Sequence, residues 1–345
     1  MRKDRQGARG QVHTITVDSV ALRDNLLGDP AVRDVAVYVP AGHDGAGLPL
    51  LVDLVGFTGS GFSHVAWRNF GENVPERLDR LIAAGMPPVV VAFPDCFTRL
   101  GGNQYIDSVA MGRWEEFLCV EMLAAVESRF GCGGGGQRGV FGKSSGGYGA
   151  LVHAMRHADV WSAAASHSGD VGWDLTFASD FPRLLRSLAR HGGIEAFMTA
   201  FEATEKPSED DVHDLMTLAM AASYDPDPSA FLGVRLPVDL HTCERDPVRW
   251  ARWLAWDPLT LVEHHADALR SLRLLYIDCG DRDQYNLVYG SRVLHRRLDA
   301  LGVPHVYEEF PDDHTKVDYR MDVSLPLLAR ALTPARLVDG RGRQA

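Results

Sequence analysis

Short apolar runs alternate with amphipathic helical patterns along most of this chain, and that alternation limits its fold more than any other feature. Runs of buried-strand length lie at residues 34–39, 48–55, 88–93, 138–141, 272–279 and 305–310, and residues 159–168 could lead into or form another strand. Helical patterns lie between or after them, at residues 75–85, 112–130, 146–157, 287–301 and 323–332. Strands that alternate with helices predict an α/β fold, with a mostly parallel central sheet and helices on both faces.

One interval between predicted strands is much longer than a crossover requires. About 100 residues separate residues 159–168 from the strand at 272–279, although about a dozen residues can connect parallel strands. This segment is rich in Trp and Phe and contains helical stretches. We therefore expect residues 171–265 to form an inserted helical cap. The core then consists of residues 1–170 and 266–335, and a frayed tail follows at 336–345.

The charge balance is acidic, with 35 Lys and Arg against 46 Asp and Glu, a net charge of −11. A nucleic-acid surface needs a basic footprint, so we expect no nucleic-acid partner. No stretch reaches the roughly 18 consecutive apolar residues of a membrane helix, so we expect no membrane partner. The N-terminus also lacks the apolar segment of a secretion signal.

The cysteines give no indication of a metal site. The five cysteines are scattered along the chain and show no C-x-x-C spacing, which structural zinc sites commonly have. We therefore expect no metal, and no motif indicates an organic cofactor. An odd number of scattered cysteines without a secretion signal favours a reducing, cytoplasmic location.

The sequence Gly142-Lys143-Ser144-Ser145-Gly146 matches the G-x-S-x-G motif of a nucleophile elbow. In this motif a sharp turn from a strand to a helix exposes the serine oxygen above the sheet. The context agrees, because a predicted strand precedes the motif and a predicted helix follows it. The motif predicts Ser144 as a nucleophile and the backbone N–H of Ser145 as a donor to an oxyanion.

A phosphate-binding loop is the competing interpretation, because Gly142-Lys143-Ser144 resembles the end of G-x-x-x-x-G-K-[ST]. The first glycine of that motif would fall at position 137, which is Gln137. Successive backbone N–H groups must curl around the phosphate, so the spacing matters. We therefore favour the nucleophile elbow.

A serine nucleophile needs a base and an acid, which follow it in this chain order in hydrolases of this kind. The loop after the predicted strand 305–310 contains His314, the candidate base. The loop after 272–279 contains Asp283, the favoured acid. Asp281 and then Asp278 are the alternatives, because a loop position reaches the imidazole better than a position within the strand.

Several stretches together resemble the putative-esterase group of α/β-hydrolases. This group includes enterochelin esterases, S-formylglutathione hydrolases and bacterial mycolyltransferases. The matching stretches are LVGFTGSG (54–61), FPDCFTRLGGNQYIDS (93–108), GKSSGGYGA (142–150), SHSGD (166–170), DCGDRDQYNL (278–287) and EEFPDDH (308–314). The resemblance implies the α/β-hydrolase fold, and it places Asp283 at the acid position of a D-x-G-x-x-D-x-[FY] loop.

The resemblance also implies the second oxyanion donor. In the family a strand ends in His-Gly or Asp-Gly, and the residue after that glycine donates its backbone N–H. Here the pair is Val55-Gly56, so the donor would be Phe57. The departure at Val55 removes a polar side chain but leaves the N–H in place.

The loop at 93–108 is long, polar and aromatic, and it follows a predicted parallel strand. Such loops lie at the carboxyl edge of the sheet, where ligands bind. The alternative is that the loop only packs under the cap. The candidate substrate-binding residues in this loop and elsewhere are Asn103, Gln104, Tyr105, Tyr148 and Trp173.

Together these features predict a serine hydrolase that cleaves a small-molecule carboxylic ester through an acyl-enzyme. The resemblance suggests a siderophore or another natural-product ester. An acyltransferase or a thioesterase could use the same three residues, and a non-catalytic binding module on a hydrolase scaffold is a third possibility. A homo-oligomer is compatible with all of these.

Overall fold

The computed structural model describes residues 7–334 of the 345-residue chain. The predicted frayed tail at 336–345 lies outside these residues. A central sheet has the strand order β1-β2-β4-β3-β7-β8-β9-β10. Its strands are β1 (Gln11–Asp18), β2 (Val32–Val39), β3 (Leu50–Leu54), β4 (Val90–Pro94), β7 (Arg138–Lys143), β8 (Ala163–His167), β9 (Leu274–Gly280) and β10 (Val306–Phe310).

The sheet is mostly parallel, as the sequence predicts. From β4 to β10 every neighbouring pair is parallel, whereas β1 and β2 pair antiparallel at one edge. The predicted strands are all present. β1 was not predicted, because its exposed edge position leaves it alternating and polar rather than continuously apolar. A second, small sheet pairs β5 (Asp107–Ser108) with β6 (Gly112–Arg113).

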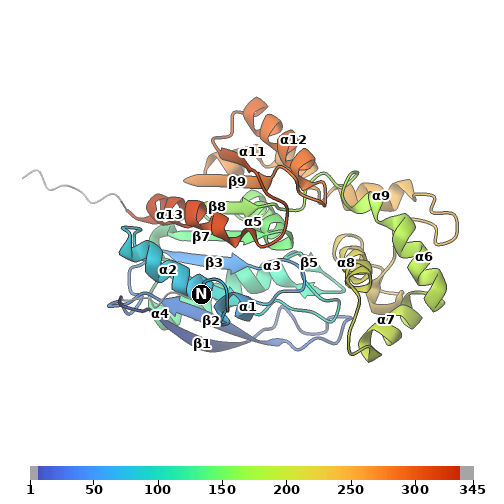
Figure 1. The fold of residues 1–345 in the computed structure, drawn as a ribbon, viewed down its shortest axis with the longest axis horizontal. Helices are drawn as coiled ribbons and strands as arrows, with labels where there is room; N and C mark the ends of the chain where they lie inside the picture. The colour runs from blue at the N-terminus through green and yellow to red at the C-terminus, as the bar shows by residue number, and fades with distance from the viewer. Residues whose placement is uncertain (1–6, 335–345) are drawn as a thin grey trace, which may run out of the picture.

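Helices cover both faces of the sheet, and each face has its own hydrophobic cluster (Figure 1). Side chains of one strand alternate between the clusters, as Leu50 and Leu51 do in β3. One face carries α1 (Gly61–Val65), α2 (Val74–Ala83) and α13 (Met321–Leu332). The other carries α3 (Trp114–Glu116), α4 (Leu123–Phe130), α5 (Ser145–Arg156), α10 (Pro258–His264), α11 (Ala266–Arg270) and α12 (Leu287–Ala300).

The helix predicted at 112–130 is not a single α-helix. Its first residues belong to β6, and a π-helical stretch, Phe117–Met122, separates α3 from α4. The apolar residues at 3.6-residue spacing do not distinguish an α-helix from a helix with a local π-turn, because both bury one face.

Between β8 and β9 the chain forms a helical lobe, which we define as residues 173–256. It contains α6 (Phe181–His191), α7 (Ile194–Ala203), α8 (Glu209–Tyr224) and α9 (Pro247–Leu254), which lie to one side of the sheet (Figure 1). α10 also falls in the predicted cap, 171–265, but it packs against α5 and α12. The largest hydrophobic cluster includes residues of both lobe and core, so the division into two units stays a prediction.

A single carboxylate joins the two ends of the lobe. Asp257 caps α10 by accepting from the N–H of Leu259. The same carboxylate accepts from the N–H groups of Gly172, at 3.2 Å, and Trp173, at 2.8 Å. The chain therefore leaves and re-enters the core at one point.

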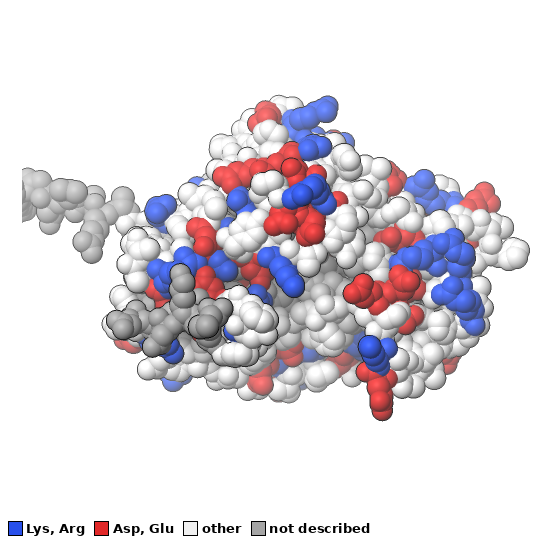
Figure 2. Space-filling view, in the orientation of Figure 1, with Lys and Arg blue, Asp and Glu red and all other residues white. Residues whose placement is uncertain are grey.

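Two features bear on the surface charge and on the length of the helices. On the face shown in Figure 2, acidic and basic side chains are intermingled and form no continuous basic stripe. Within residues 7–334, no helix has both the length and the hydrophobicity needed to cross a bilayer.

Candidate active site

Ser144 lies at the sharp turn between β7 and α5. Its backbone has φ 57° and ψ −125°, a conformation that side-chain-bearing residues rarely adopt. The N–H of Ser144 donates to the carbonyl of His167 at 3.0 Å, and its carbonyl accepts from the N–H of Tyr148 at 2.8 Å. These bonds hold the serine half-exposed at the carboxyl edge of the sheet, as an elbow requires.

The two glycines of the motif are required by the end of β3, which passes directly beside the turn. A Cβ atom at Gly142 would lie 2.3 Å from the carbonyl oxygen of Leu54, and one at Gly146 would lie 1.7 Å from it. Neither distance is possible, and both neighbours are backbone atoms that cannot move independently. Only glycine therefore fits at either position.

Asp283 and His314 form a buried acid–base pair. The Oδ2 atom of Asp283 lies 2.7 Å from Nδ1 of His314, while its Oδ1 atom accepts from the N–H of Tyr285 at 2.9 Å. An ionised carboxylate only accepts hydrogen bonds, so Nδ1 carries the proton and Nε2 is left as the basic atom. Asp283 is 5% exposed and His314 8%.

The two alternative acids do not contact His314. Asp281 is exposed and faces Arg282 at 3.4 Å. Asp278 is fully buried and binds His167 and Arg320, each at 2.8 Å. Burial alone would raise the pKa of Asp278, but His167 and Arg320 outweigh it and hold the pKa below its ordinary value. Asp278 therefore serves an internal ion pair.

Backbone contacts join the loops that carry the acid and the base. The N–H of Asp281 donates to the carbonyl of Phe310 at 2.9 Å, and the N–H of Arg282 donates to that of Asp312 at 3.1 Å. A side chain at Gly280 would collide with Asp312, because its Cβ would lie 2.5 Å from the carbonyl oxygen there. These contacts fix Asp283 relative to His314.

The turn after β3 lies against Ser144. A Cβ atom at Gly56 would lie 3.4 Å from the Cβ of Ser144, and Phe57 follows directly. The N–H of Thr58 donates to the carbonyl of Gly101 at 2.9 Å and anchors the turn. Ser145 is the first residue of α5, where N–H groups have no partner within the helix. Both predicted oxyanion donors thus belong to backbone next to Ser144.

The side chain of Ser145 belongs to a buried polar network that the sequence did not reveal. Its Oγ accepts from Nε2 of Gln104 at 2.8 Å and donates to Oδ2 of Asp170 at 3.3 Å. Gln104 in turn accepts from the hydroxyl of Tyr224 at 3.0 Å. Burial, with a smaller contribution from the charge of Asp283, raises the pKa of Asp170 to about 7.

The other polar candidates for substrate binding are also directed into the protein. Asn103 donates to the carbonyl of Cys96 at 3.2 Å and accepts from the N–H of Tyr105 at 2.6 Å. The hydroxyl of Tyr105 donates to the carbonyl of Val55 at 2.5 Å, and that of Tyr148 donates to the carbonyl of Trp256 at 3.2 Å. These bonds support the walls of the site, and contact with a substrate stays a prediction.

Trp173 is completely buried in an aromatic cluster between lobe and core. Its ring centroid lies 4.2 Å from that of Tyr224 and 5.8 Å from that of Tyr148. Phe177 and Trp253 extend the cluster into the lobe. Trp173 thus packs the junction of lobe and core, and its contact with a substrate stays a prediction.

Tyr285 is a site residue that sequence reasoning did not single out. Its ring meets the ring of His314 edge to face, with centroids 4.9 Å apart and planes at 88°. It is 40% exposed, and the ring of His213 in α8 lies 5.8 Å from it on the lobe side. The sequence did contain a signal for this residue, because Tyr285 occupies the aromatic position of the D-x-G-x-x-D-x-[FY] loop.

α8 is the lobe helix that lies over the site. His213 faces Tyr285, and Leu215 contacts Gly101, beside the turn that carries Phe57. Tyr224, at the end of the helix, binds Gln104. One helix therefore touches both the loop of the acid and the loops beside the nucleophile.

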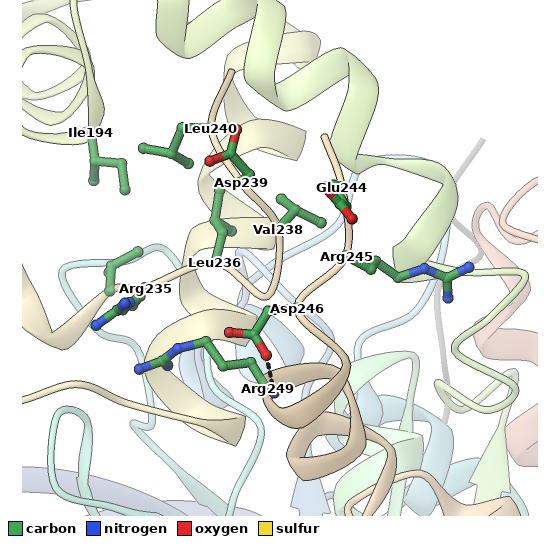
Figure 3. Close-up of a pocket in the computed structure, with 11 residues that line it drawn as sticks. Ile194, Arg235, Leu236, Val238, Asp239, Leu240, Glu244, Arg245, Asp246 and Arg249 are labelled. Carbon is green, nitrogen blue, oxygen red and sulfur yellow. Dashed lines mark hydrogen bonds between the residues drawn. The ribbon is translucent and has the colours of Figure 1, made fainter. Parts of the chain in front are cut away.

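A hollow of about 540 Å³ lies elsewhere in the lobe, and none of the predicted site residues lines it (Figure 3). Its charged lining residues already serve the fold. Arg235 pairs with Asp227 and Arg245 with Asp174, and Asp246 caps α9. These groups stabilise the lobe rather than converge on the hollow.

Comparison of the sequence with known proteins gave a family match. The sequence model of the family described as "Putative esterase" matches residues 31–325. No curated protein is similar enough in sequence to match the chain.

Similar solved structures include three proteins of low sequence identity. A ferulic acid esterase is 18% identical, covering 94% of this chain and 100% of that chain, with a TM-score of 0.61. The S-formylglutathione hydrolase of Agrobacterium tumefaciens is 16% identical over 95% and 98%, with a TM-score of 0.60. MPT51 of Mycobacterium tuberculosis is 17% identical over 94% and 99%, with a TM-score of 0.53. At these identities the likeness shows a shared fold.

Proposed function

Since the chain belongs to the putative-esterase family and has the α/β-hydrolase fold, we propose that it is a carboxylic ester hydrolase that forms an acyl-enzyme on Ser144. The observation that carries this assignment is the 2.7 Å contact between Asp283 and His314, at the same sheet edge as the strained turn of Ser144. A nucleophile, a base and an orienting acid are the groups that acyl transfer needs.

In the proposed reaction, Nε2 of His314 takes the proton of the Ser144 hydroxyl as its oxygen attacks the ester carbonyl. Asp283 keeps the imidazole in the correct tautomer and stabilises the imidazolium that forms. The tetrahedral intermediate collapses when His314 gives the proton to the departing alcohol. Water then attacks the acyl-enzyme by the same steps, releasing the acid and restoring Ser144.

The backbone N–H groups of Phe57 and Ser145 are the proposed donors to the oxyanion. Backbone donors are held rigidly and need no reorganisation when charge develops. Val55 contributes no polar side chain here, and its carbonyl accepts from Tyr105. Substrate recognition next to the oxyanion therefore falls to other groups.

For the substrate, we propose a small-molecule ester of a natural product, a siderophore ester included. The resemblance to enterochelin esterases supports this class. A thioester or an alcohol acceptor would use the same acyl-enzyme, so the assay should offer both.

The position of α8 supports a role for the lobe in choosing the ester. Tyr285 is the link, because it touches the ring of His314 and faces α8. We expect Tyr285→Ala to change the ratio of kcat/KM between small and bulky acyl esters. Tyr285→Phe keeps the ring and should keep the wild-type ratio. If Tyr285→Ala lowers kcat/KM for every ester by one common factor, the lobe does not select the substrate through this residue.

Fluorophosphonate labelling tests the nucleophile directly. The wild-type protein should label and hydrolyse esters, and Ser144→Ala should lose both, with kcat lower by about 10⁴–10⁶-fold. Ser271→Ala, at an exposed serine after α11, should behave as wild type. Labelling that persists in Ser144→Ala contradicts the assignment. A folded wild-type protein that neither labels nor turns over esters would instead be a binding module.

A further inference from the structure

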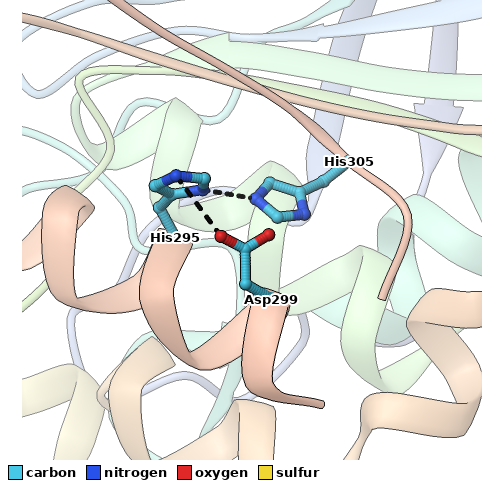
Figure 4. Close-up of side chains that lie close together, drawn as sticks. All are labelled: His295, Asp299 and His305. Carbon is cyan, nitrogen blue, oxygen red and sulfur yellow. Dashed lines mark hydrogen bonds and ion pairs between the residues drawn. The ribbon is translucent and has the colours of Figure 1, made fainter. Parts of the chain in front are cut away.

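Two histidines and an aspartate converge at a second place, away from Ser144. His295 and Asp299 lie one turn apart near the end of α12, and His305 immediately precedes β10 (Figure 4). The Nδ1 atom of His295 lies 2.8 Å from Nε2 of His305, and its Nε2 lies 3.5 Å from Oδ2 of Asp299. One ligand atom of each residue lies within 4.8 Å of one from each of the others.

Hydrogen bonding fixes which nitrogen of His305 is available to a ligand. Nδ1 of His305 lies 2.9 Å from the carbonyl of Val303, so Nδ1 donates and Nε2 carries the free lone pair of the neutral ring. Nε2 is the atom that lies 2.8 Å from Nδ1 of His295. His305 therefore directs its accepting nitrogen toward the other two residues.

We propose that His295, Asp299 and His305 bind one divalent transition-metal ion, with Zn²⁺ as the ion of best fit. Two imidazoles and a carboxylate suit Zn²⁺ and similar metals, whereas Mg²⁺ and Ca²⁺ prefer oxygen alone. Zn–N distances of about 2.0–2.1 Å place tetrahedral ligand atoms about 3.4 Å apart. One nitrogen of each imidazole and one carboxylate oxygen already lie within 4.8 Å of one another, so metal binding requires rotations that bring these three atoms closer.

The surroundings orient the proposed ligands as metal sites require. The bond from His305 Nδ1 to Val303 fixes the tautomer in which Nε2 carries the lone pair for the metal, as is usual around a ligating histidine, and the metal would replace the contact between Nε2 and His295. Tyr307 stacks on His295, with centroids 4.6 Å apart and planes at 13°, and limits its rotation. Asp299 and His295 are partly exposed, so a metal can enter and water can fill the fourth position.

The site is separate from the catalytic groups. α12 starts after the loop of Asp283 and β10 ends before the loop of His314, and the cluster joins the opposite ends of these two elements. The scattered cysteines pointed away from metal, but the ligands of this site are two histidines and an aspartate. His305 is brought to the other two residues only by the return of the chain from α12 into β10.

Titration of the full-length, chelator-treated protein with Zn²⁺ tests the proposal. Calorimetry should give one ion per chain, and Co²⁺ should give the visible absorption of a four-coordinate site with nitrogen ligands. His305→Ala and Asp299→Asn should weaken Zn²⁺ binding, the histidine variant by more than about 100-fold. Mg²⁺ should not compete.

Three controls keep the result interpretable. His264→Ala removes an exposed histidine from the end of α10 and should bind Zn²⁺ as wild type does. His314→Ala excludes binding at the catalytic base and should also retain the site. Circular dichroism and ester turnover measured without metal should be unchanged in His305→Ala. Wild-type affinity in His305→Ala, or no binding to the wild-type protein below 1 mM Zn²⁺ (roughly the weakest affinity of a specific site), overturns the proposal.

Discussion

The buried carboxyl of Asp170 should make the stability of this protein fall as the pH rises. Its pKa is raised from 3.8 to about 7, first by burial. Between these values the folded protein holds a proton that the unfolded chain has released, so the free energy of unfolding decreases with rising pH. About 2 pH units lie between pH 5 and the folded-state pKa of about 7. At about 1.36 kcal/mol per unit, the free energy of unfolding falls by about 3 kcal/mol from pH 5 to pH 8.

Asp170→Asn removes this titration and keeps a group of the same shape that can accept from Ser145. We therefore expect the variant to gain up to about 3 kcal/mol over wild type between pH 5 and pH 8. Urea unfolding of both proteins at the two pH values measures the change. Asp44→Asn, at an exposed carboxylate, is the matched control and should show no such gain. A difference between Asp170→Asn and wild type that is the same at pH 5 and pH 8 refutes the reasoning.

The remaining predictions concern the acid, the elbow and the aromatic cluster. Asp283→Asn should lower kcat by about 10⁴-fold with the fold intact, whereas Asp281→Asn should leave kcat nearly unchanged. If steady-state assays give the reverse order, the assignment of Asp283 as the acid is wrong. Gly146→Ala should yield no folded protein, because the new Cβ would lie 1.7 Å from a backbone oxygen. The control Gly134→Ala should fold, because its Cβ would enter open space. A native circular dichroism spectrum for Gly146→Ala contradicts the geometry. Trp173→Ala should cost about 3–5 kcal/mol of unfolding free energy, as expected for a fully buried ring, and a loss below about 1 kcal/mol in urea titrations is incompatible with its packing.

The parts of the fold that the sequence predicted are those that local signals encode. Buried parallel strands are continuously apolar, so β3, β4 and β9 could be found without knowing their neighbours. The turn at Ser144 was equally accessible, since glycines at fixed spacing report a close backbone approach. Asp283 was preferred over Asp278 because a residue in the loop can reach the imidazole better than a residue within the strand.

Other features depend on contacts between distant segments and had no local signal. The network around Ser145 joins Gln104, Asp170 and Tyr224, which only the folded chain brings together. No pattern within any one segment indicates that Asp170 is buried, or that this burial raises its pKa. The same holds for α8, whose place over the site depends on the packing of the whole lobe.

The carboxylate of Asp257 has a consequence for how this architecture can diversify. Because it holds both Gly172 and Trp173, the two chain crossings between lobe and core lie side by side. A segment attached in this way can be lengthened, shortened or exchanged without altering the distance that the core must span. Recombination between relatives could therefore transplant the lobe while the elbow and the acid–base loops are inherited unchanged. One requirement is that a transplanted lobe supplies a ring that packs against Tyr148, as Trp173 does in this protein.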